Sequence, residues 1–465
     1  MTLNQSTHLL RWTLLLGASL LAACGGGGSQ PPASLGGKVY GLLPGTQLGI
    51  EENGSRIIVT TPSYQAGVPQ LFAIERGYEL GTSYSLAIYR QPLNQLCRIT
   101  RNATGVLNVS QNDVRVDCHR TVFNDTGIRS TDPQVNASPA LAPDALVGRD
   151  AEVDRLTKVG AGAFGFDYTK ICRSGDAVAA SGTCPADTFF SAPNAWACTR
   201  DNVTGLVWQI RDLGDFDPLV SAPPDGFCGK SGWRSPKTRE LLSLVHSGKQ
   251  SGLAAAIDLD FFPDTPAEAF RADEVYPDGD GAAWIVHFGQ RGASVRSAAG
   301  ATLKQRWVAS RSPSPLADTA SADYVRIDAD PSDVDVVVEM PSELAWLVPK
   351  SAPAALDWAA ANARVVAAND AMAGGYSDWR LPNRNELEAL VQRGPAASVP
   401  ALAPGIVGSD PAGFRKTFWT ASPGMGDPQA QAWLINFEYG DLSLGLKSGT
   451  AAVILVRNKA SGPQP

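Results

Sequence analysis

The feature that most constrains the fold of this chain is an internal repeat in its second half. A Trp-Arg-x-Pro motif occurs twice, at Trp233-Arg234-Ser235-Pro236 and at Trp379-Arg380-Leu381-Pro382. Other tryptophans flank both motifs in the same order, namely Trp208 and Trp346 before them and Trp284 and Trp433 after them. Ordered landmarks of this kind predict a tandem duplication of one fold. We expect the repeated tryptophans to lie in the core rather than to stack on sugars.

Each motif is followed by the signals of a helix start. Asn383 and Glu386 have the spacing of a capping box, and in the first copy Ser235 stands before Pro236, which suits the first helical position. A further helix is predicted over 354–372, and strands over 418–421, 432–437 and 452–456. Helices followed by antiparallel strands predict an α+β layout.

The motif arginines have acidic partners at a matching distance. Arg234 precedes Glu240, and Arg380 precedes Glu386, by the same number of residues. We expect each pair to hold the turn against the helix. No nucleophile or base accompanies them in the sequence, so a structural role is favoured over catalysis.

The N-terminus has the features of an export signal. Residues 1–23 combine a polar start, Arg11 and an apolar run, which is typical of a secretory signal peptide. The sequence Leu21-Ala22-Ala23-Cys24 resembles the lipobox of bacterial lipoproteins, which implies that Cys24 is lipidated. A Gly/Ser/Pro tether follows over 24–36. Because Gly25 rather than Asp comes next, the resemblance implies the outer membrane, with the protein facing the periplasm or the cell surface.

The remaining cysteines predict disulfides. An even number in an exported chain favours disulfide bonds over thiol chemistry, and the absence of a C-x-x-C motif disfavours zinc or redox roles. The simplest pairing joins sequence neighbours, although other pairings stay open: Cys97 with Cys118, Cys172 with Cys184, and Cys198 with Cys228.

Residues 37–120 contain short alternating apolar and polar stretches separated by Gly, Pro and Asn. This pattern predicts a small antiparallel β-sandwich that serves as a spacer. Residues 121–146 are rich in Pro, Ala, Asp and Asn, which predicts a linker.

The repeated motifs carry a family resemblance. Gly205-Leu206-Val207-Trp208, Gly232 to Pro236 and Gly375 to Pro382 resemble the bacterial domain found at the C-terminus of the Legionella collagen-like adhesin. The resemblance covers two copies, which we name copy one (147–312) and copy two (320–458). It implies a C-type-lectin-like fold and ligand binding without enzymatic activity. The adhesin domain binds sulfated polysaccharide, but the net charge of −7 disfavours sulfated ligands here.

Composition limits the partners and cofactors. The acidic net charge and the lack of a basic block argue against nucleic acid binding, and four scattered histidines argue against a histidine metal centre. Asp278 and Asp280 stand at alternate positions beside glycine, as in calcium loops, but a solvated acidic loop is the preferred interpretation. We therefore expect no cofactor and no metal, with calcium as the alternative.

An exposed binding rim is predicted in copy two, formed by Trp419, Asp427 and Gln431. Together these features predict a cell-envelope lipoprotein, anchored in the membrane through Cys24, whose duplicated domains bind an extracellular glycan or protein ligand. The alternative is a structural or assembly component of an envelope complex. The sequence does not indicate the oligomeric state.

Overall fold

We describe the fold from a computed structural model of the chain. The signal peptide, Cys24 and Cys184 lie outside the described residues. Among the described residues, no helix is long and apolar enough to cross a membrane. The structure describes residues 32–42, 46–61, 69–90, 92, 95–120, 124–129, 143–151, 153, 156, 158–178, 195–210, 222–249, 254–278, 280–298, 301, 303–309, 324–327, 334–339, 344–393, 401–403, 405–406 and 411–458.

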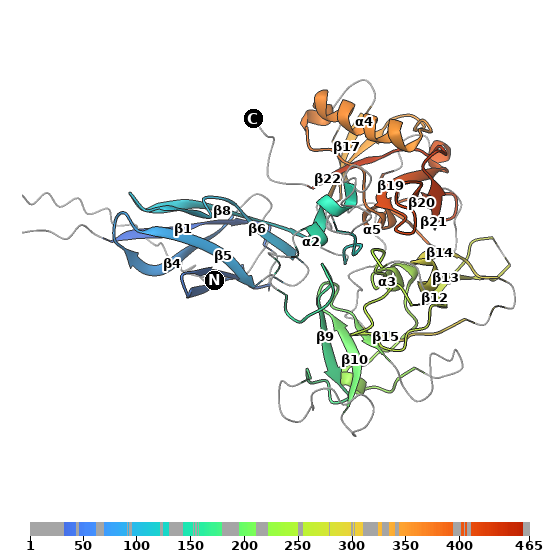
Figure 1. Ribbon diagram of the computed structural model, residues 1–465, viewed down its shortest axis with the longest axis horizontal. Helices are drawn as coiled ribbons and strands as arrows, with labels where there is room; N and C mark the ends of the chain where they lie inside the picture. The colour runs from blue at the N-terminus through green and yellow to red at the C-terminus, as the bar shows by residue number, and fades with distance from the viewer. Residues whose placement is uncertain are drawn as a thin grey trace, which may run out of the picture.

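The N-terminal module consists of two four-stranded sheets around one apolar core. The sheet orders are β4-β1-β8-β6 and β3-β2-β5-β7, and the β1–β8 pair is parallel where antiparallel pairing was expected. Figure 1 shows this module projecting from one side of the repeated part. Its strands are β1 Ala33–Tyr40, β2 Leu48–Glu52, β3 Ser55–Val59, β4 Gln70–Tyr78, β5 Ser83–Arg90, β6 Gln95–Arg101, β7 Thr104–Val106 and β8 Gln111–Arg120.

Copy one forms one small sheet, one short helix and a three-stranded meander. The small sheet has the order β15-β11-β10-β9, and the meander is β12-β13-β14. The elements are β9 Tyr168–Cys172, β10 Trp196–Asp201, β11 Val207–Gln209, α3 Thr238–Leu242, β12 Ala269–Val275, β13 Ala283–His287, β14 Ala293–Arg296 and β15 Val308–Ala309, with short turns at α2 Gly148–Ala151, η2 Pro143–Leu146, η4 Phe227–Gly229 and η5 Phe288–Gln290.

Copy two repeats this arrangement. Its small sheet has the order β22-β18-β17-β16, and its meander is β19-β20-β21. The elements are β16 Tyr324–Ile327, β17 Val334–Glu339, β18 Leu344–Pro349, α4 Trp358–Asp370, α5 Arg384–Glu388, β19 Thr417–Pro423, β20 Gln431–Asn436, β21 Asp441–Leu446 and β22 Leu455–Asn458, with turns at η7 Ala373–Gly375 and η8 Pro411–Phe414.

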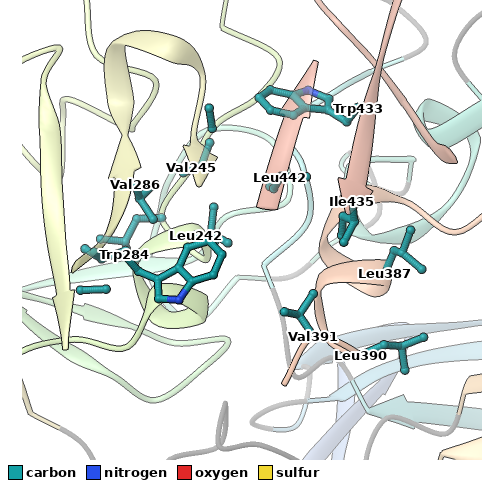
Figure 2. Close-up of a cluster of buried hydrophobic side chains, with 14 of the residues drawn as sticks. Leu242, Val245, Trp284, Val286, Leu387, Leu390, Val391, Trp433, Ile435 and Leu442 are labelled. Carbon is teal, nitrogen blue, oxygen red and sulfur yellow. The ribbon is translucent and has the colours of Figure 1, made fainter. Parts of the chain in front are cut away.

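The two copies share one sheet and are not separate domains. Strands β14 and β21 pair, so the two meanders form one six-stranded sheet, β12-β13-β14-β21-β20-β19. One apolar cluster also extends through both copies. Figure 2 shows Leu242, Val245 and Trp284 of copy one facing Leu442 and Ile435 of copy two across this junction. We call copies one and two together the fused body.

The predicted α+β, C-type-lectin-like fold is wrong. Most of the described regular structure is β, and of the described α-helices only α4, with 13 residues, is longer than five residues. The capping box at Asn383 correctly predicted where α5 begins, but it says nothing about helix length. In copy one the helix begins after Lys237 instead of Ser235, because the carbonyl of Pro236 accepts the backbone N–H of Asp273 in β12.

Candidate functional site

Each Trp-Arg-x-Pro motif forms the same ion pair. Arg380 Nη1 and Nη2 both lie 2.6 Å from the carboxylate oxygens of Glu386, and Arg234 makes the matching contacts with Glu240 at 2.8 and 2.6 Å. Oε2 of Glu386 also accepts the backbone N–H of Asn383, and Oε2 of Glu240 accepts that of Lys237. Both predicted arginine–glutamate pairs are therefore present, and each connects the motif to the start of the helix that follows it.

The repeated tryptophans are core residues. Trp208, Trp284, Trp346 and Trp433 are fully buried. Trp284 and Trp433, at equivalent positions in the two meanders, each lie under a guanidinium from copy two. Arg384 lies 4.2 Å from the ring centre of Trp433, and Arg393 lies 4.5 Å from that of Trp284. The contact between Arg393 and Trp284 therefore joins the two copies, whereas the contact between Arg384 and Trp433 lies within copy two.

Two of the predicted disulfides are present. Cys97 and Cys118 pair between β6 and β8, and Cys198 is bonded to Cys228. Cys172 is also disulfide-bonded, but its predicted partner Cys184 lies outside the described residues.

The predicted ligand-binding residues do not come together in one site. Asp278 and Asp280 both form ion pairs with Arg296. Trp419 is only 1% exposed, so it does not form an exposed rim. Its indole N–H donates to the carbonyl of Leu356 at 2.8 Å. Trp358, at the start of helix α4, packs edge-on against its ring. Among the described residues, no group of His, Cys, Asp or Glu side chains could hold a metal ion.

Asp427 and Gln431 lie on the turn between β19 and β20. Asp427 is exposed and accepts the backbone N–H of Ala430, and Gln431 begins β20 opposite Leu446. The same turn contains Gly426, which packs against the guanidinium of Arg291 from copy one. This contact connects the predicted loop to a pocket that the sequence did not reveal.

A pocket of about 350 Å³ lies where the two copies meet. We call it the seam pocket. Copy one contributes the turn before β14 and the strand itself, and copy two contributes β20 and β21. Its lining residues are Gly289, Gln290, Arg291, Ala293, Val295, Trp433, Ser443 and Leu444.

Arg291 is the charged residue of the seam pocket. It is 9% exposed, and its buried Nε has no hydrogen-bond partner among the residues that the structure describes. Burial lowers the pKa of Arg291, whereas the hydrogen bond that Arg234 donates to Glu240 raises the pKa of Arg234. No sequence signal distinguishes Arg291, because only the pairing of β14 with β21 encloses its side chain.

Apart from the seam pocket, a cluster of buried polar side chains lies where residues 124–129 and 143–151 enter the fused body. The predicted linker is buried over 124–128 and at Asp144 and Ala145, whereas Leu146 is exposed. Asn385 of α5 donates to the carbonyl of Asn124 at 2.7 Å, and Ser422 of β19 donates to Asp144 at 2.7 Å. Burial, together with repulsion between the carboxylates, raises the pKa of Asp144 to about 7. Burial also raises the pKa of Asp125 to about 6 and that of Asp150 well above its ordinary value.

Comparison with known proteins supports the family resemblance. The family model of the Lcl C-terminal domain matches residues 197–309 and 335–457, which together make up about half of the chain. These matches fall within copy one and copy two. No curated protein matches the chain. The chain therefore belongs to the Lcl C-terminal domain family, whose domain it contains twice in tandem.

Proposed function

We propose that the protein is a cell-envelope lipoprotein that binds a glycan or protein ligand through its fused body, in the manner of an adhesin. The observation that carries this proposal is the seam pocket, because residues of both copies line it. Its volume is at the lower end of the range of small-ligand pockets, which suits one sugar unit or one side chain.

The N-terminal half of the chain supports the same proposal. The lipobox at Cys24 and the tether after it would attach the protein to a membrane. The sandwich of β1 to β8 would then hold the fused body away from the lipid surface (Figure 1). This order of anchor, spacer and binding domain suits a protein that presents a ligand site at a distance from its membrane.

Binding is tested with the full mature chain carrying Cys24→Ser, which keeps it unlipidated, on an array of bacterial and host glycans. Ser443→Trp should fill the seam pocket and abolish saturable binding. Asn108→Trp, on an exposed loop of the sandwich, is the matched control and should bind normally. If no glycan or protein ligand binds, and the lipidated chain instead co-purifies with an envelope complex, the assembly role replaces the binding role.

The anchor is tested separately by fractionating cells. The unaltered chain should be found in the outer-membrane fraction and incorporate labelled palmitate. The Cys24→Ser chain should do neither. Equal fractionation of the two chains would contradict lipid anchoring without affecting the ligand proposal.

A further inference from the structure

Arg291 differs from the other buried arginines of the fused body. Arg384 donates to two carbonyls and a hydroxyl, and Arg306 donates to Gln209 and Thr265. Arg393 is paired with Glu388. Among the described residues, Nε lacks a hydrogen-bond partner in all four of these arginines, but Arg291 differs because its Nη1 and Nη2 have no acceptor either and no carboxylate pairs with it. A guanidinium is always charged, and a buried charge is unfavourable unless it is paired.

The backbone holds Arg291 in place. Its φ of 55° lies in the left-handed region, and its carbonyl accepts Nη1 of Arg384 at 2.9 Å. The next residue, Gly292, has a φ of 83° and packs so tightly that a Cβ would lie 2.5 Å from Val245. On its other side the guanidinium meets Gly426. The charge is therefore preorganised at the wall of the pocket before any ligand arrives.

We propose that the seam pocket binds a carboxylate-bearing ligand, such as a uronic acid unit of an acidic glycan, with its carboxylate on the guanidinium of Arg291. This inference rests on the proposed binding function. A single guanidinium presents two parallel N–H groups, which match the two oxygens of a carboxylate. The remaining lining offers the Ser443 hydroxyl, the Gln290 amide and the apolar side chains of Ala293, Val295 and Leu444.

The pocket contains one cation, which favours a monoanion over a phosphate or a heavily sulfated group. Recognition of multiply charged groups uses clusters of Arg and Lys. None of the other lining residues is basic. The acidic net charge of the chain also disfavours long polyanions.

The site occurs once per chain although the domain occurs twice. In copy one the turn after Phe288 contains Gly289, Gln290, Arg291 and Gly292, and in copy two the turn after Phe437 contains only Glu438, Tyr439 and Gly440. The copy-two turn is one residue shorter and lacks the arginine. The expected stoichiometry is therefore one ligand per chain.

The inference is tested by calorimetric titration of the full mature Cys24→Ser chain with short galactose oligomers that carry a single galacturonic acid unit. Matched neutral galactose oligomers and sulfated galactose oligomers are titrated in parallel. We expect one site per chain and a preference for the carboxylated oligomer. Arg291→Gln should weaken that binding by about tenfold or more, which is the usual size of a charge-assisted hydrogen bond, and Arg291→Lys should weaken it less.

Two further variants keep the result interpretable. Arg271→Gln, an exposed arginine on β12 of the same sheet, should leave binding unchanged. Gly426→Ala should push the guanidinium of Arg291 out of position, because the added Cβ would clash with its Nη2. This variant should weaken carboxylate binding as Arg291→Gln does, although the charge of Arg291 is kept. Equal binding of neutral oligomers, or no effect of Arg291→Gln, would overturn the carboxylate site and leave the proposed binding function intact. Equal binding of sulfated oligomers would overturn the carboxylate assignment, and no binding of any glycan would count against both.

Discussion

Ser294 and Leu442, which occupy equivalent positions in the two copies, pair with each other across β14 and β21. Ser294 lies opposite Val286 in the first meander, and Leu442 lies opposite Ile435 in the second. Because equivalent residues of antiparallel strands meet, a local twofold axis relates the two meanders at this pair. The fusion thereby pairs two sheet edges that would otherwise be open to other chains.

The first prediction concerns the cooperativity of the fused body. Since copies one and two share a sheet and an apolar cluster, we expect them to unfold in one transition. The sandwich has its own apolar cluster and should unfold in a second transition. Scanning calorimetry of the mature chain tests this. Three separable transitions, one for each copy and one for the sandwich, would show that the copies are independent.

The sequence predicted the local features better than the fusion. The capping box of Asn383 with Glu386 and the arginine pairs depend on residues close together in the chain. The tryptophan landmarks were visible because they recur in the same order in both copies. The contact of Ser294 with Leu442 depends on two strands far apart in the chain, and no local pattern reports it. The prediction that Trp419 is exposed was wrong because of another contact between distant segments: Trp358 of α4 packs against its ring.

The second prediction concerns Arg384, which ties α5 of copy two to copy one. Its guanidinium donates to Ser247 and to the carbonyls of Arg291 and Gly292, all at 2.9 Å. Arg384→Met should lower the free energy of unfolding by about 3 kcal/mol or more, because buried carbonyls lose their donors. Urea denaturation gives the value. Arg364→Met, on the polar side of α4, serves as the control, and an equal loss in both variants would contradict this role for Arg384.

The third prediction concerns the buried aspartates near the entry of the N-terminal segment. Burial raises the pKa of Asp144 to about 7 and that of Asp125 to about 6, so the folded state holds protons that the unfolded chain releases near pH 4. The resulting stabilisation is fully present below about pH 4 and is lost progressively as the pH rises to about 7. We therefore expect the melting temperature of the fused body to fall between pH 5.5 and pH 8.

Asp144→Asn separates this effect from the other titrations. One oxygen of Asp144 accepts hydrogen bonds from the hydroxyls of Thr126 and Ser422, and the other oxygen has no hydrogen-bond partner within the described ranges. An asparagine keeps the accepting oxygen and removes the buried charge. The variant should match the unaltered chain near pH 4, become more stable than it as the pH rises, exceed it by about 2–4 kcal/mol at pH 8, and have a flatter pH profile. An unchanged pH profile would rule out this carboxyl as the source.

The fourth prediction concerns the ion pair of the second motif. Glu386 neutralises Arg380 and also accepts the backbone N–H of Asn383, so Glu386→Gln disturbs both the pair and the start of α5. Because little of either side chain is exposed, we expect a loss of about 2–4 kcal/mol in the free energy of unfolding. Glu51→Gln, which breaks the more exposed pair with Arg56 in the sandwich, should cost much less, because solvent screens that pair. Replacing both partners, with Arg380→Met and Glu386→Leu, should recover part of the loss, because it removes the unpaired buried charge. If the double variant were less stable than Glu386→Gln, the cost would come from packing or capping rather than from the orphaned guanidinium.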